Sequence, residues 1–183
     1  MTNNSRNGVT LTAPEDIAFV NALSGEDDLG VVIRVAIWTE NILVRLVEQP
    51  LPAPKELEKL NLDYHGRISL AVALGMPADM APALRALGSL RNRFAHRLDM
   101  KLTTADVANI FNALPAQRRS YIQDFLNQMH KEGVTARAKY SLLSAQDQFK
   151  LIAMSLRSFL LGGLDEQAAL LKARQPGQPV SGD

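Results

Sequence analysis

The chain has 183 residues, of which 46% are hydrophobic, and this is enough apolar material for one well-formed core. Its formal net charge is +1, so no overall field attracts a polyanion, and any nucleic-acid binding must come from a local patch. The sequence contains no cysteine, which excludes disulfides, thiolate nucleophiles and cysteine-based metal sites. No cofactor and no metal is expected, because the histidines form no ligand pair and no glycine-rich loop could bind a phosphate.

Helices are predicted for most of the chain, because the hydrophobic residues repeat with the period of an α-helix and no segment alternates as a strand would. Proline, glycine and capping residues place the expected helices at 14–24, 26–48, 55–60, 64–74, 78–98, 103–114, 115–132 and 145–161, and leave open a further one at 164–173. We therefore expect an all-α fold, a single-domain helical bundle of about seven to eight helices spanning 13–173. Residues 1–12 are expected to be a flexible N-terminus and 174–183 a disordered tail.

The longest apolar segment, 29–47, is predicted to be a buried amphipathic helix. It is too often interrupted to span a membrane, by Arg34, Glu40, Asn41 and Arg45. The N-terminal segment lacks the cationic start and the apolar centre of a secretion signal. A cytoplasmic protein without membrane contact is therefore expected.

Polar side chains interrupt the apolar face of the helix expected at 78–98, in the segment Leu90-Arg91-Asn92-Arg93-Phe94-Ala95-His96. At about 100° per residue, Arg91 falls on the same arc as the apolar residues Leu84, Leu87, Leu90, Phe94 and Leu98. A guanidinium group on this face must find a carboxylate, backbone carbonyls or water. Asn92 and His96 are neighbours on the flank of the arc, whereas Arg93 and Arg97 lie on the solvated side.

Glu40 is the second charge expected on an apolar face, since it lies away from the polar side of the helix at 26–48. Our hypothesis is that Glu40 and Arg91 form a structural ion pair between two helices, because either charge buried alone would be costly. In the alternative interpretation, Glu40 faces a solvent-filled groove and Arg91 extends to its edge. Gly88 indicates either a close approach of another helix or a bend.

Together these features resemble the mannitol operon repressor family. The resemblance rests on the internal Glu40, on Gly66-Arg67-Ile68-x-Leu70-Ala71-x-Ala73-Leu74-Gly75, and on the Leu90 to His96 segment, within about residues 14–172. The run Arg91-Asn92-Arg93-Phe94-Ala95-His96 is also similar to the R-N-x-x-x-H signature of the wider HEPN (higher eukaryotes and prokaryotes nucleotide-binding) helical domains. The resemblance implies a HEPN-like helical regulator of sugar-alcohol uptake genes, without a usual DNA-reading module.

Three functions are compatible with these observations. The first is a non-enzymatic transcriptional regulator that acts mainly through contacts with another protein. The second is a metal-independent HEPN-type ribonuclease that uses Arg91, Asn92 and His96, since arginine binds phosphate and histidine transfers protons near neutral pH. Arg91 and His96 diverge by about 140° on an ideal helix, which makes it difficult for one subunit to direct both at a single phosphate, whereas a dimer with two such helices side by side would solve this.

The third function is a repressor that binds DNA directly. Its candidate basic surface consists of Arg85, Arg93, Arg97 and Lys101, with Arg118-Arg119 nearby in sequence. No helix-turn-helix pattern supports it, and charges on a helix face are most often solvated surface.

A homodimer is also expected, because the helices at 26–48 and 145–161 carry more apolar residues than one core-facing stripe needs. The surplus is clearest at Leu156, Phe159, Leu160 and Leu161.

Overall fold

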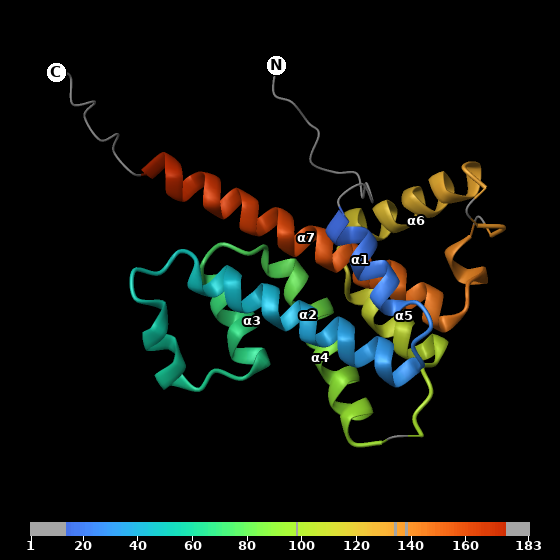
Figure 1. Cartoon of the computed structure of the whole chain (residues 1–183), viewed down its shortest axis with the longest axis horizontal. Helices are drawn as coiled ribbons and strands as arrows, with labels where there is room; N and C mark the ends of the chain where they lie inside the picture. The colour runs from blue at the N-terminus through green and yellow to red at the C-terminus, as the bar shows by residue number, and fades with distance from the viewer. Residues whose placement is uncertain (1–13, 98, 134, 138, 175–183) are drawn as a thin grey trace, which may run out of the picture.

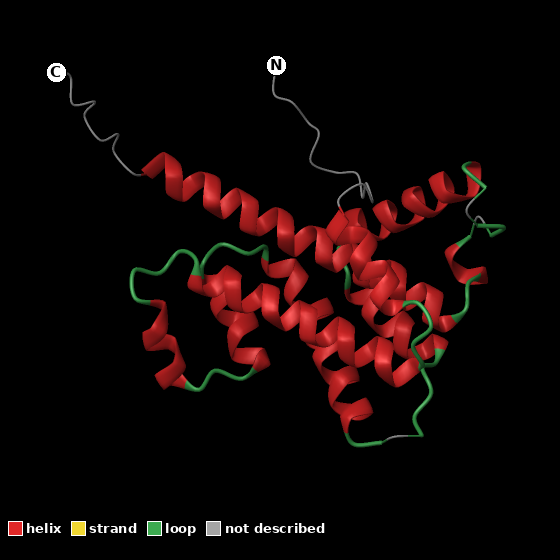
Figure 2. Cartoon of the chain, in the orientation of Figure 1, coloured by secondary structure: helices red, strands yellow, loops and turns green. Residues whose placement is uncertain are grey.

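The computed structural model describes residues 14–97, 99–133, 135–137 and 139–174, and within them the fold is all-α, as predicted. The α-helices are α1 Pro14–Leu23, α2 Asp28–Glu48, α3 Tyr64–Ala73, α4 Ala81–Ala95, α5 Thr104–Ala113, α6 Ala116–Lys131 and α7 Ala145–Arg174 (Figure 1). Short 3-10 helices are η1 Pro54–Leu60, η2 Ala78–Met80 and η3 Tyr140–Leu142. Figure 2 shows the helices joined by loops, with η1 in a long connection that projects from the bundle between α2 and α3.

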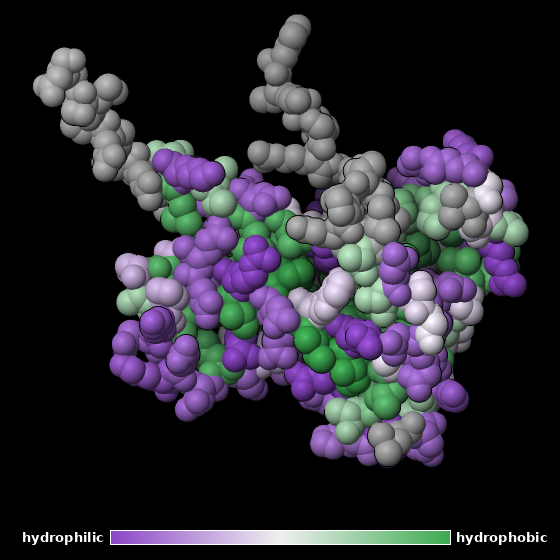
Figure 3. Space-filling model, viewed as in Figure 1, coloured by the Kyte–Doolittle hydropathy of each residue, from purple (hydrophilic) through white to green (hydrophobic). Residues whose placement is uncertain are grey.

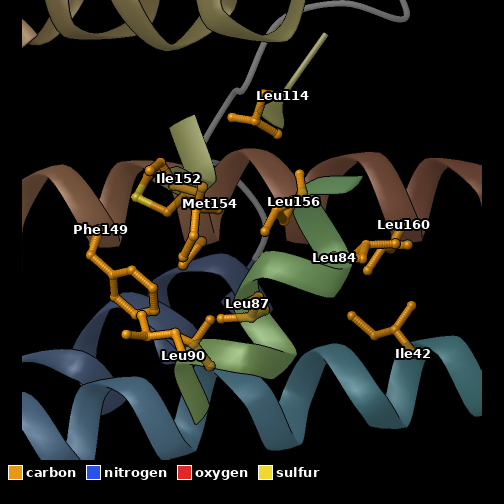
Figure 4. Close-up of a cluster of buried hydrophobic side chains, with 14 of the residues drawn as sticks. Ile42, Leu84, Leu87, Leu90, Leu114, Phe149, Ile152, Met154, Leu156 and Leu160 are labelled. Carbon is orange, nitrogen blue, oxygen red and sulfur yellow. The ribbon is translucent and has the colours of Figure 1, made fainter. Parts of the chain in front are cut away.

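The helix that carries Arg91, α4, packs against α2, α3 and α5, while α2 also packs along α7. The predicted apolar arc of α4 is buried at Leu84, Leu87, Leu90 and Phe94, each at most 1% exposed. Figure 4 shows Leu84, Leu87 and Leu90 between residues of α7 and α2. Leu98, the last residue of the predicted arc, lies outside the described residues. Because α4 packs against three other helices, its inward-facing polar residues must find partners within the bundle.

Side-chain caps start several helices within two residues of the predicted positions. Asp27 and Asp63 accept hydrogen bonds from the backbone N–H groups of Gly30 and Gly66, each at 2.7 Å, at the starts of α2 and α3. Thr103 starts α5 with a reciprocal capping box to Asp106. These caps satisfy backbone donors that the first helical turn leaves without partners.

Two predicted helix ends are wrong. The helix carrying Arg91 ends at Ala95 and not at residue 98, because the Arg97 N–H bonds to the Phe94 carbonyl and closes a tighter turn. The break predicted at Gly162-Gly163 is absent, and α7 continues to Arg174. Packing explains this continuity: Gly163 lies against Leu46 of α2, and Leu164 is buried at 3% exposure.

The predicted terminal segments, 1–12 and 174–183, lie outside the described residues, except that Arg174 is still helical in α7. Within the described part of the chain, no helix combines the length and the apolar character needed to cross a membrane.

Candidate functional site

Glu40, Arg67 and Arg91 form a charged cluster where α2, α3 and α4 meet. Arg67 Nη1 donates a hydrogen bond to Glu40 Oε1 at 2.6 Å, and Arg91 Nη2 lies 3.6 Å from Glu40 Oε2. The hypothesis that Glu40 faces Arg91 agrees with this geometry, but Arg67 is the closer partner and the sequence interpretation gave it no role. The expectation that the two charges are buried is wrong, since the side chains of Glu40, Arg67 and Arg91 are 31%, 32% and 33% exposed.

Tyr64 forms one wall of this charged cluster. The Arg91 guanidinium carbon lies 5.9 Å from the centroid of its ring, close enough for a cation–π contact. The Tyr64 hydroxyl donates a hydrogen bond to the Leu84 carbonyl at 3.1 Å. Burial, and then the charge of Glu40, raise the pKa of Tyr64 well above its usual range, against the opposing effect of Arg91. Tyr64 therefore stays neutral, and its hydroxyl joins α3 to α4.

Gly88 allows α3 and α4 to approach closely, as one of its two sequence interpretations predicted. A Cβ atom at this position would lie 2.6 Å from both Cδ1 and Cε1 of the Tyr64 ring. No side chain larger than that of glycine fits without moving the ring, so Gly88 fixes the position of Tyr64 beneath Arg91.

The three residues of the R-N-x-x-x-H motif do not converge. Arg91 is directed to Glu40 and Tyr64, whereas Asn92 and His96 are exposed. His96 is the residue that ends α4, and its backbone N–H bonds to the Phe94 carbonyl. Among the described residues, no hydrogen bond or ion pair joins these three side chains to one another, and no group of histidine and acidic residues could hold a metal ion. Within one copy of the chain, Arg91 therefore points to partners that Asn92 and His96 do not share.

The predicted basic surface is partly occupied by contacts within the chain. Arg85 Nη2 donates to Ser69 Oγ at 3.3 Å, and Arg93 forms an ion pair with Asp106 of α5. Arg97 and Lys101 are exposed. Of the four residues of the predicted basic surface, Arg93 is therefore neutralised by the Asp106 carboxylate.

Asp106 connects this surface to the start of α5. Burial alone would raise its pKa, but hydrogen bonds from Thr103 and Arg93 outweigh that effect and hold the pKa below its usual value. The Asp106 carboxylate therefore completes both the cap of α5 and the ion pair to α4.

Arg118 and Arg119, the other basic pair, are also engaged. The guanidinium carbon of Arg118 lies 4.8 Å from the centroid of the Phe159 ring, and Arg119 Nη1 donates to the Asn112 carbonyl at 3.0 Å. These contacts connect α6 to α7 and to the end of α5, so they serve the bundle.

The apolar surplus that predicted a homodimer is largely used inside the bundle. Leu156 and Leu160 of α7 are buried at 1% and 0% exposure, and Phe159 lies against Arg118. Among the residues whose side chains the structure describes, the large hydrophobic ones that remain exposed come from four separate segments: Ile37, Leu60, Leu142 and Leu170. On the face shown in Figure 3, hydrophilic residues alternate with hydrophobic ones. The homodimer remains a prediction, because the leucines expected to form its interface, Leu156 and Leu160, are buried inside the bundle.

A cavity of about 270 Å³ lies next to the charged cluster. It opens between α2, η1 and the start of α3, and is lined by Val44, Val47, Glu48, Leu57, Glu58, Asn61, Leu62 and Arg67. Arg67 belongs both to this lining and to the ion pair with Glu40, so the cavity and the charged cluster share one guanidinium group.

Comparisons with protein-family models, with curated proteins and with solved structures give no match.

Proposed function

We propose that the chain is a non-enzymatic regulator of transcription that acts through contacts with another protein, as its resemblance to the mannitol operon repressor family implies. The observation that supports this is the position of Arg91, the residue that a phosphate-cleaving or phosphate-binding function would need most. Its guanidinium group is held by Glu40 and Tyr64 of the same chain. Arg91 then serves to join α4 to α2 and α3, and surfaces elsewhere on the bundle contact the partner.

The first measurement compares transcript levels with and without the gene that encodes this chain. Its deletion should change the expression of a small set of genes, and the promoter of the most affected gene then serves as the DNA probe. The purified chain alone should leave this probe unshifted in a gel, whereas the probe should shift with the protein that co-purifies with the tagged chain after nuclease treatment. A shift by the chain alone would instead support direct DNA binding, and an unchanged set of transcripts would contradict any regulatory function.

A metal-independent ribonuclease is the second candidate, because Asn92 and His96 are both exposed and thus open to a substrate. Such an enzyme would use an arginine from a second copy, since Arg91 of the same chain is directed to Glu40 and Tyr64. The measurement is cleavage of a labelled single-stranded RNA in the presence of EDTA. Cleavage that disappears in a folded His96→Ala variant, with a pH–rate profile that changes near the histidine pKa, would replace the regulatory proposal with this one.

A further inference from the structure

The charged cluster contains one more positive charge than negative charge. Glu40 is the only carboxylate in ion-pair contact with either Arg67 or Arg91 among the described residues, and each of its oxygens faces a different guanidinium group. Arginine cannot lose its proton near neutral pH, so both guanidinium groups stay charged. The cluster therefore carries one surplus positive charge where three helices meet.

The two guanidinium groups also have unused hydrogen-bond donors. Each has five N–H donors, yet among the described residues Arg67 donates only to Glu40, and Arg91, at 3.6 Å from Glu40, is too far for a normal hydrogen bond. In the described part of the chain, Arg91 makes no hydrogen bond to a protein acceptor. Because both side chains are about one third exposed, a small solute can reach these donors.

The surroundings of the charged cluster do not cancel the surplus charge. The Tyr64 hydroxyl is neutral and already bonded to Leu84, so it contributes no charge. Glu48 and Glu58 line the adjoining cavity together with Arg67, but among the described residues neither carboxylate forms an ion pair with either arginine of the cluster. Glu58 is exposed, so solvent and salt weaken its effect on the charged cluster.

We propose that the Glu40, Arg67 and Arg91 cluster is a binding site for the carboxylate group of a small monoanionic ligand. The anion binds to the free donors of Arg67 and Arg91 beside Glu40, and the cavity next to Arg67 holds the rest of the ligand. A single negative charge neutralises the cluster, whereas a phosphate dianion would leave a negative excess next to Glu40. The planar guanidinium group matches a carboxylate in geometry, since it can donate two parallel hydrogen bonds. Such binding does not depend on whether the chain regulates transcription.

The test is a titration with sodium acetate, exchanged for sodium chloride at constant ionic strength and pH 7. Acetate should raise the unfolding temperature in a saturable manner and should shift the side-chain Nε–Hε signals of Arg67 and Arg91 in ¹H–¹⁵N spectra with the same midpoint. Binding to the folded chain stabilises it in proportion to ligand occupancy. Inorganic phosphate, titrated in the same way, should bind less tightly than acetate.

Variants separate this site from a general salt effect, with each acetate response measured against the same variant without acetate. Arg67→Gln and Arg91→Gln should abolish the response. Glu40→Gln should strengthen it several-fold, because the competing carboxylate is removed. Arg85→Gln removes an exposed arginine from the same helix as Arg91 and serves as the matched control, with an unchanged response.

Three results would overturn the proposal. They are a linear response to acetate that never saturates, an equal response in Arg67→Gln, or phosphate binding tenfold tighter than acetate binding, which corresponds to about 1.4 kcal/mol.

Discussion

Replacement of Gly88 by alanine tests how closely α3 and α4 are packed. The new Cβ atom would lie 2.6 Å from two atoms of the Tyr64 ring, a separation that the structure cannot keep. The ring has little freedom to move, because Tyr64 is only 7% exposed and its hydroxyl is bonded to the Leu84 carbonyl. Gly88→Ala must therefore displace the ring, the backbone of α4, or both.

The expected magnitude follows from three contributions. Alanine favours a helix interior over glycine by about 1 kcal/mol. Overpacking of a dense core costs about 1–3 kcal/mol, and a displaced Tyr64 hydroxyl without its acceptor costs about 1–3 kcal/mol more. We expect a net loss of about 2 kcal/mol in the free energy of unfolding, which for a domain of this size lowers the unfolding temperature by about 4–8 °C.

The assay is urea unfolding followed by circular dichroism, with the m-value checked for constancy. Gly162→Ala in α7 is the matched control, because a Cβ atom there meets nothing within 4 Å and the change should raise stability by about 0.5–1 kcal/mol. A second variant, Tyr64→Leu, should remove most of the cost of Gly88→Ala when the two are combined. The reasoning would be refuted if Gly88→Ala were as stable as the unmodified chain.

Three further predictions concern the caps and the charged cluster. Thr103→Ala should lower the free energy of unfolding by about 1 kcal/mol, and a loss below the error of urea unfolding would contradict the capping role of Thr103. Asp106 has a lowered pKa in the folded chain, so its contribution to stability is present above its unfolded pKa and is lost as the pH falls through the folded pKa. Acid unfolding curves of Asp106→Asn should therefore be flatter below about pH 4, and curves of unchanged steepness would argue against this linkage. Double-mutant cycles should give a larger coupling for Glu40 with Arg67 than with Arg91, on the order of 1 kcal/mol for the closer pair, and the reverse order would contradict the observed distances.

The sequence predicts most helices well because the signals that start a helix are local. The caps Asp27, Asp63 and Thr103 lie within one residue of the expected helix starts, and the apolar arc of α4 is the face that the bundle buries. The end of a helix depends more on what packs beyond it. Gly162-Gly163 is a stop signal by propensity alone, but Gly163 against Leu46 and the buried Leu164 keep α7 helical past it.

The charged cluster shows where a pattern in one helix ceases to be informative. Helical periodicity places Arg91 and Glu40 on inward faces, and this is enough to suggest that they meet. Helical periodicity gives no information about how α3 is rotated about its own axis where it packs against α2. In the structure α3 is rotated so that Tyr64, Ile68 and Ala71 are buried. In this orientation Arg67 lies 2.6 Å from Glu40.

Arg67 in turn changes the character of the site. An ion pair formed by Glu40 and Arg91 alone would be electrically neutral and would serve only to join two helices. With Arg67 as the closer partner, Arg91 keeps a charge that Glu40 cannot fully compensate, and the side chain remains about one third exposed. The close packing of α3 on α4 that positions Tyr64 therefore also accounts for the surplus positive charge of the cluster, on which the proposed anion site depends.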